Sequence, residues 1–165
     1  MVKKNQVVRF MVGKESFGID IARIQEIVIV PEITGIPDTP DFLEGIINLR
    51  GKIVSIIDLR KRLKVNGAER NKKNRILVTE LDGKVVGLIV DEVSEVLKLN
   101  PDNIEPPPEM VNSAGAEYIT GIGKLEDRII LLLDLGRVLK AEELASLDTH
   151  ETAPHMLAEI GQKAA

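Results

Sequence analysis

The chain has 165 residues, 44% of them apolar, and a formal net charge of −4, so it is long enough for one domain or two small joined ones. It contains no cysteine, which excludes disulfides and thiolate metal sites and fits a reducing compartment. No apolar run is long enough to span a membrane, and the polar start gives no sign of a signal peptide. Because aromatic residues make up only 2%, we expect a core of isoleucine, leucine and valine.

The first predicted elements are a hairpin and a long loop. Apolar runs at 6–12 and 16–21 flank a short polar turn, which predicts the hairpin. Residues 21–28 have apolar side chains at helical spacing, but the stretch is too short to distinguish a helix from a strand. Four breakers then predict an extended loop over 30–40, namely Pro31, Gly35, Pro37 and Pro40.

The centre of the sequence is a second hairpin with Arg50 at its tip. The runs Ile46–Leu49 and Ile53–Ile57 are rich in β-branched residues and flank Arg50 and Gly51. Glycine takes the positive φ that a tight reversal commonly requires. The pattern therefore predicts two antiparallel strands joined by a tight turn.

A short helix and a basic stretch follow this hairpin. Asp58 lies where the N-cap of a helix over 59–63 belongs. The next residues, 64–75, are polar and hold several lysines and arginines. We expect this stretch to be a mobile, solvated surface loop.

Two further hairpins are predicted in the second half. Asp82 and Gly83, between apolar runs, give the strongest short hairpin signal of the chain. Three successive prolines limit 104–108 to an edge strand at most. Runs at 118–125 and 128–133 predict the fourth hairpin, and Asp134 again precedes a short helix. Residues 142–147 can form one more helix, and the tail 148–165 is expected to be flexible.

Parts of the first half are repeated in the second. Residues 44–63 align without a gap with 120–139, and residues 17–28 align with 86–97. The alignments match glycines and acids at corresponding places, namely Gly45/Gly121, Asp58/Asp134, Gly18/Gly87 and Glu26/Glu95. Four hairpins, little helix and two similar halves predict a mainly β fold built as two small barrels.

Catalytic chemistry is not visible in the sequence. The two histidines, His150 and His155, lie in the tail, where solvated side chains are the simpler interpretation. No phosphate-binding loop and no carboxylate set at metal-ligand spacing is present, and Ser55 lacks the setting of a nucleophile elbow. We therefore expect no enzyme and no cofactor. Scarce aromatics and a negative charge also argue against a nucleic-acid partner.

Arg50 has two interpretations that spacing alone leaves open. It can be an exposed turn residue, held locally by a carboxylate such as Glu26. It can also be a contact residue, because arginine forms planar multidentate hydrogen bonds and is favoured at interface hot spots.

A series of short motifs runs through the chain in a fixed order: Phe17-Gly-Ile-Asp-Ile, Pro40-Asp-Phe-Leu-Glu-Gly, Asn48-Leu-Arg-Gly, Ile57-Asp-Leu, Val86-Gly-Leu-Ile-Val-Asp-Glu-Val and Tyr118-Ile-Thr-Gly-Ile-Gly. In this order the sequence resembles the CheW-like domain family of bacterial chemotaxis, and we expect a single such domain over 5–147. The kinase CheA and the receiver fusion CheV carry the same domain. Because no phosphotransfer, ATP-binding or receiver segment is seen, a stand-alone adaptor is favoured.

The resemblance implies a fold and a role. The fold would be two intertwined five-stranded SH3-like β-barrels with short helices and an apolar groove between them. The role would be that of a cytoplasmic, non-enzymatic scaffold without a cofactor. It would couple the regulatory domain of the histidine kinase CheA to the cytoplasmic tip of methyl-accepting chemoreceptors. It would reach membrane-anchored receptor arrays through these partners, without entering the membrane itself.

The resemblance also implies protein-binding residues. By motif position, Glu26, Gly45 and Arg50 correspond to coupling positions, and Ile27 and Asn48 adjoin them. Val86 and Val90 fall on a strand near the inferred groove. Simpler interpretations remain open, since Gly45 can be a backbone requirement and the valines can be core residues. A different class of function, a β-barrel that holds a small ligand in its groove, would need convergent polar groups that the sequence does not obviously supply.

Overall fold

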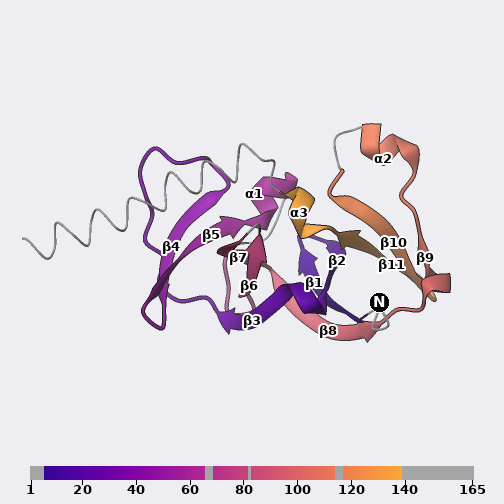
Figure 1. Cartoon of the computed structure of the whole chain (residues 1–165), viewed down its shortest axis with the longest axis horizontal. Coiled ribbons are helices and arrows are strands. Elements are labelled where there is room, and N and C mark those ends of the chain that lie inside the picture. Colours follow the sequence, from indigo (N-terminus) through magenta and orange to yellow (C-terminus); the bar gives the residue numbers. More distant parts are fainter. Residues whose placement is uncertain (1–5, 66–68, 82, 114–116, 139–165) are drawn as a thin grey trace, which may run out of the picture.

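The computed structural model describes residues 6–65, 69–81, 83–113 and 117–138, and these residues form a mainly β protein (Figure 1). The strands are β1 Gln6–Val12, β2 Glu15–Asp20, β3 Ile24–Ile29, β4 Leu43–Leu49, β5 Lys52–Asp58, β6 Arg75–Leu81, β7 Lys84–Val90, β8 Glu92–Lys98, β9 Ile104–Glu105, β10 Ile119–Leu125 and β11 Arg128–Leu133. The short helices are α1 Leu59–Leu63, α2 Glu109–Ser113 and α3 Leu135–Val138, with 3-10 turns η2 Ile21–Arg23 and η3 Pro101–Asn103.

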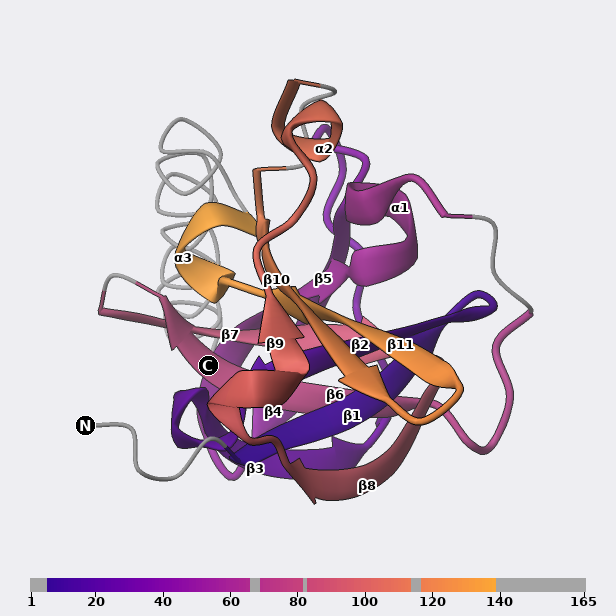
Figure 2. The same ribbon diagram turned by 90° about the vertical axis from the view of Figure 1, so that its right-hand side faces the viewer.

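The strands form two sheets, and each sheet contains strands from both halves of the chain. The six-stranded sheet has the order β8-β1-β2-β11-β10-β9, and the five-stranded sheet has the order β3-β6-β7-β5-β4. Both are visible in Figure 1, and in Figure 2 the six-stranded sheet lies on the side that faces the viewer. The prediction of a mainly β fold with two intertwined units is confirmed. The sixth strand, β9, is a two-residue edge strand, as the following prolines predicted.

The ladder registers confirm the internal repeat. In the β4–β5 hairpin Gly45 lies opposite Ile56, and in the β10–β11 hairpin Gly121 lies opposite Leu132, the corresponding pair. Each hairpin then adds a parallel strand at corresponding residues. Ser55 of β5 pairs with Val86 of β7, as Leu131 of β11 pairs with Phe17 of β2. Residues matched by sequence therefore occupy equivalent places in the two units.

The two halves of the chain exchange their first hairpins: β1 and β2 lie in the sheet with β8 to β11, and β6 and β7 lie in the sheet with β3 to β5. Glu26 of β3 lies opposite Val78 of β6, a strand of the second half. Its repeat partner Glu95, in β8, lies opposite Arg9 of β1, a strand of the first half. Each half thus completes the sheet that the other begins, so neither half holds a complete sheet of its own.

The core is aliphatic, as the composition predicted. The larger cluster draws from both sheets and contains the ring pair Phe10 and Phe17, whose centroids are 6.0 Å apart. A second cluster fills the five-stranded unit alone and consists of Ile47, Val54, Ile56, Ile76, Val78 and Ile89. The larger cluster, which we call the central cluster, joins the two units through one hydrophobic core. Burial of apolar surface in such a core stabilises the fold by about 25 cal/mol per Å².

Local predictions around the helices are met in most places. Asp58 is the N-cap of α1 and accepts a hydrogen bond from the Arg60 amide at 2.9 Å. The ambiguous stretch 21–28 is resolved as one 3-10 turn followed by strand β3. The 3-10 turn has a local cause, because the Asp20 carboxylate caps it, and the strand has a tertiary one, because the residues after the turn hydrogen-bond to β6.

The basic stretch 64–75 is exposed at residues 69–73, as predicted for a solvated surface loop, but it is anchored at two points. In its described part the Arg70 guanidinium donates to the buried Asp58 carboxylate at 2.8 Å, and Asn74 is only 4% exposed. Sequence reasoning missed these anchors because their partners lie on other elements. Asp82, the expected helix at 142–147 and the tail 148–165 lie outside the described residues. Across the part of the chain that is described, no helix is long and apolar enough to cross a bilayer.

Candidate protein-binding surface

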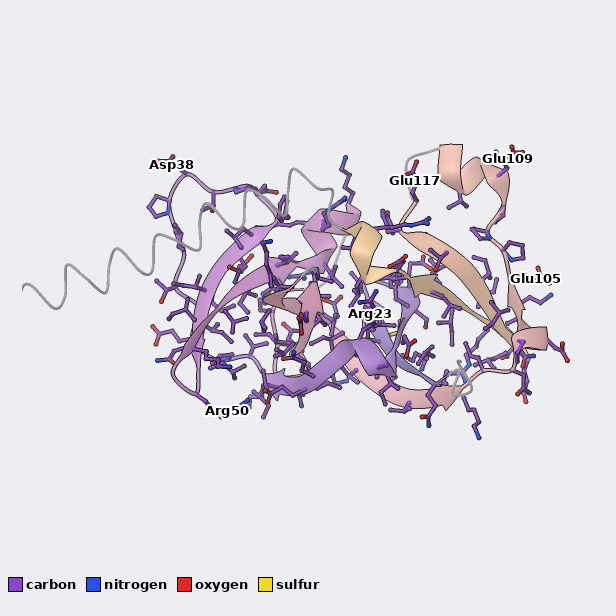
Figure 3. The ribbon with its side chains drawn as sticks, viewed as in Figure 1. Arg23, Asp38, Arg50, Glu105, Glu109 and Glu117 are labelled. Atoms are coloured by element: carbon purple, nitrogen blue, oxygen red, sulfur yellow. The ribbon has the colours of Figure 1, made fainter. Side chains whose placement is uncertain are left out.

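The tip of the β4–β5 hairpin presents Arg50 at the margin of the molecule (Figure 3). Arg50 and Gly51 both have positive φ, 51° and 88°, as in the primed turns that match the twist of a hairpin. The Asn48 side chain accepts a hydrogen bond from the Gly51 amide at 2.7 Å and so closes the turn. Asn48 therefore has a clear structural task, which is to hold the turn that carries Arg50.

Arg50 is oriented by Glu26, as proposed from the sequence. Its Nη1 donates to Glu26 Oε1 at 3.1 Å, and its Nη2 pairs with Oε2, so the contact is bidentate. The arginine side chain remains 69% exposed and the glutamate 30%. The hydrogen bonds from Arg50 lower the pKa of Glu26, and the same bonds raise the pKa of Arg50, so both groups are charged near neutral pH.

The ion pair lies beside a hollow over one end of the smaller core cluster. The hollow measures about 170 Å³ and is lined by Gln25, Glu26, Leu49, Arg50, Lys52, Val54, Val78 and Val85. Val54 and Val78 are members of that core cluster. An apolar floor beneath a charged rim suits a protein contact better than a solvated face alone.

Gly45 is required by the backbone. Its φ is +149°, and a Cβ built there would lie 2.2 Å from the carbonyl oxygen of Thr34. Thr34 is held in place by two hydrogen bonds with Ile46, each 2.9 Å long. The structure thus supplies the simpler explanation of this glycine, which is close packing of the 30–40 loop on β4.

The predicted residues do not all reach the surface. Ile27 is 40% exposed on the outward face of β3. Val86 and Val90 are fully buried in the central cluster. The expectation that these valines border an accessible groove does not hold in this structure, because they point into the core that joins the units. They cannot touch a partner unless that core opens.

Several exposed apolar residues were missed by sequence reasoning. They are Ile29, Ile53, Val96, Met110 and Ile129. The repeat makes Ile53 equivalent to Ile129, and Ile27 equivalent to Val96. Burial in β3 alternates along the strand, so reading 24–29 as a strand would have placed Ile27 and Ile29 on one outward face.

The six-stranded unit carries a different charge arrangement at the hairpin tip that corresponds to the one with Arg50. Glu126 lies at the tip of the β10–β11 hairpin, with a φ of 44° like that of Arg50. Glu95, the counterpart of Glu26, instead contacts Arg9 at 3.2 Å and Arg128 at 3.7 Å. Of the two corresponding hairpin tips, only that of the five-stranded unit therefore carries an arginine. This difference makes the two ends of the molecule chemically distinct.

The described residues contain no group of three or more histidine, cysteine, aspartate or glutamate side chains that could hold a metal ion. The charged groups instead pair with one another across neighbouring elements. What the surface offers is an oriented cation at the rim of a hollow with an apolar floor.

The fold is that of an interlocked double-barrel β protein, and comparison with known proteins agrees. The chain belongs to the CheW-like domain family, whose description matches residues 6–143. It is 42% identical over 139 residues to a chemotaxis protein CheW of Klebsiella aerogenes, covering 84% of each chain, and 32% identical over 146 residues to that of Treponema pallidum, covering 86% of each. The crystal structure of the scaffolding protein TtCheW from Thermoanaerobacter tengcongensis has a TM-score of 0.77 and 39% identity, covering 85% of this chain and 90% of that one.

Proposed function

We propose that this chain is a non-enzymatic adaptor in bacterial chemotaxis signalling, which couples the regulatory domain of CheA to the cytoplasmic tip of methyl-accepting chemoreceptors. The relatives named chemotaxis protein CheW and the neighbour described as a scaffolding protein support the adaptor role. The two partners follow from the family resemblance. The observation that carries the proposal is the Glu26–Arg50 pair, which holds an exposed guanidinium in one orientation.

The geometry of this pair suits recognition of a partner. Glu26 takes one edge of the guanidinium, and the remaining N–H groups of Arg50 face solvent. Arginine is pre-organised by its planar fork, and a fixed orientation lowers the entropy lost on binding. Lysine at the same position would lack both the fork and the bidentate contact.

The surroundings of the pair suit a helical partner. Ile27 lies on the outward face of β3, next to Glu26 in sequence. A receptor tip is a helical hairpin, and an amphipathic helix binds by placing its apolar face on such aliphatic side chains. We therefore assign Glu26, Ile27, Asn48 and Arg50 to the contact surface, with Gly45 as its support.

An adaptor needs no chemistry of its own. Binding two partners at different surfaces raises their effective concentration for each other, and the chemical difference between the two units provides different surfaces. Receptor binding would also bring the chain to membrane-anchored receptor arrays. We also propose that the chain hydrolyses no nucleotide and needs no cofactor.

Binding measurements with separate partners test this function. The receptor cytoplasmic fragment and CheA are each titrated into the purified chain, and CheA autophosphorylation is measured with receptor, with and without the chain. We expect binding to both partners and kinase activation that requires the chain. Binding to neither partner, or ATP turnover by the chain alone, would refute the proposal.

A further inference from the structure

A second surface of the five-stranded unit joins an exposed isoleucine to a basic turn. Strand β3 ends at Ile29, whose side chain is 70% exposed and which lies opposite Arg75 in the ladder with β6. An open hollow of about 570 Å³ adjoins them, lined by Ile29, Val30, Arg70, Asn71, Lys72 and Asn74. Its floor is aliphatic and its far wall is basic.

The basic wall is a turn whose backbone is fixed by side-chain hydrogen bonds. The Asn71 amide donates to Asn74 Oδ1 at 3.0 Å, and the Lys73 amide donates to Asn71 Oδ1 at 2.7 Å. Asn74 is nearly buried, and its Nδ2 donates to the carbonyl of Asp91 at 3.0 Å. Arg70 anchors the other end of the turn through its bond to Asp58. The cations of the turn therefore stand on a fixed backbone.

These cations divide into two kinds. The guanidinium groups of Arg70 and Arg75 are engaged, the first by Asp58 and the second by the carbonyls of Lys72 and Asn74. Lys72 and Lys73 are exposed, and neither ammonium group has an ion pair with any residue that the structure describes. The turn thus presents two adjacent available positive charges, Lys72 in the wall of the hollow and Lys73 next to it in sequence, on a protein whose net charge is −4.

We propose that this hollow, formed by Ile29, Val30 and the turn 70–75, binds an acidic amphipathic segment of a chemotaxis partner. The aliphatic side chains of that segment would cover Ile29 and Val30, and its carboxylates would meet Lys72 and Lys73. Charge complementarity selects the acidic partner, and the exposed isoleucine selects an amphipathic one. The inference rests on the proposed adaptor function, because it requires such a partner.

The residues that line this hollow differ from those that line the hollow beside Glu26 and Arg50. The two surfaces adjoin along β3, because Ile27 and Ile29 lie on the same outward face of that strand. A nucleic acid fits the hollow less well, because none of the described residues that line it has an aromatic side chain for base stacking.

A charge-matched comparison tests the assignment. The double variant Lys72→Glu/Lys73→Glu is titrated with CheA and with the receptor fragment at low and high salt. Its control is Lys14→Glu/Lys98→Glu, which changes the net charge equally at two exposed lysines, one in the β1–β2 turn and one at the end of β8. We expect one partner to bind at least about fivefold more weakly to the first variant, with the loss shrinking at high salt. Ile29→Ser should weaken the same partner, and the control should not.

The outcomes separate this inference from the function on which it rests. A wild-type chain that binds neither partner refutes the adaptor function and this inference with it. This inference alone is overturned if the wild-type chain binds both partners and the Lys72→Glu/Lys73→Glu variant binds them with equal affinity. It is also overturned if the control variant loses as much affinity as the Lys72→Glu/Lys73→Glu variant. The acids Glu142, Glu143 and Asp148 are replaced by amides in the whole chain as a further check. If this shifts the amide resonances of Ile29, Lys72 and Lys73 without partner, the occupant is the chain's own C-terminal segment and the partner assignment is wrong.

Discussion

Glu26 and Arg50 join the two edges of the five-stranded sheet. Glu26 belongs to β3, at one end of the strand order, and Arg50 follows β4, at the other end. Within the described residues no backbone ladder connects these two edge strands, so the side-chain pair closes the unit where hydrogen-bonded strands do not. The arrangement lets one ion pair both orient the guanidinium and tie the hairpin tip to β3.

Replacing Arg50 should affect binding far more than folding. The side chain is mostly exposed, so Arg50→Ala should leave the melting temperature nearly unchanged. Loss of an arginine hot spot should weaken assembly with receptor and CheA at least about tenfold. Isothermal titration calorimetry with each partner, together with thermal unfolding of the variant, measures both effects.

Two further variants separate charge from geometry at this pair. Arg50→Lys keeps the charge but loses the bidentate contact, so we expect intermediate binding. Glu26→Ala should give a smaller loss, and a double-mutant cycle with Arg50→Ala measures the coupling. If Arg50→Ala unfolds the protein, the residue is structural. If assembly and kinase activation are unchanged, Arg50 is not part of the contact surface.

The ion pair should make a small acid-dependent contribution to stability. Because Arg50 lowers the pKa of Glu26 in the folded chain, the contribution is complete above the carboxyl's ordinary value of 4.5 and is lost as the pH falls through the lowered value. Denaturant unfolding of the wild type and Glu26→Gln from pH 7 to pH 3 tests this. Their difference should be constant near neutrality, shrink as the pH falls below 4.5 and decrease in high salt. A difference that changes with neither pH nor salt would show that another contact of Glu26 is responsible.

Much of the fold could be predicted from local signals. The hairpin around Arg50 and the N-cap at Asp58 depend on residues close in sequence, and the structure shows both. The stretch 21–28 could not be assigned, because its strand conformation depends on pairing with β6 far along the chain. The exchange of hairpins between the two halves is equally non-local, and no periodicity within a segment encodes it.

The candidate site was predictable to a lesser degree. Glu26 could be named as the partner of Arg50, and the structure contains that contact. The burial of Val86 was not predictable, because an apolar strand residue can face a groove or a core and only the packing of both sheets decides. The anchors of the basic turn were missed because Asp58 and Asp91, which hold it, come from other elements.

Gly45 should be required for stability. An alanine would meet the Thr34 carbonyl and would also have to adopt a positive φ. Strain and displacement together should destabilise Gly45→Ala by about 2 kcal/mol or more. The matched control is Gly35→Ala, where a Cβ meets nothing within 4 Å, and its stability should change by less than about 0.5 kcal/mol. A stable Gly45→Ala chain that fails to bind partners would instead assign the glycine to the contact surface.

The repeat supplies a matched pair of N-caps whose different surroundings predict different costs. Asp58 is buried, caps α1 and accepts the Arg70 guanidinium at 2.8 Å. Its counterpart Asp134 accepts the Gly136 amide at 2.9 Å but is partly exposed, with Arg137 at 3.5 Å.

Asp134→Ala should therefore cost about 1 kcal/mol, the usual loss of a cap. Asp58→Ala should cost about 2 to 3 kcal/mol, because it also leaves the partly buried Arg70 without its closest carboxylate. Urea unfolding of both variants gives the comparison, and hydrogen exchange at Asn71–Asn74 should rise only in Asp58→Ala, since that turn loses its anchor. Equal costs at the two positions would show that the Arg70 contact adds nothing to the cap, and that the basic turn is held by Asn74 alone.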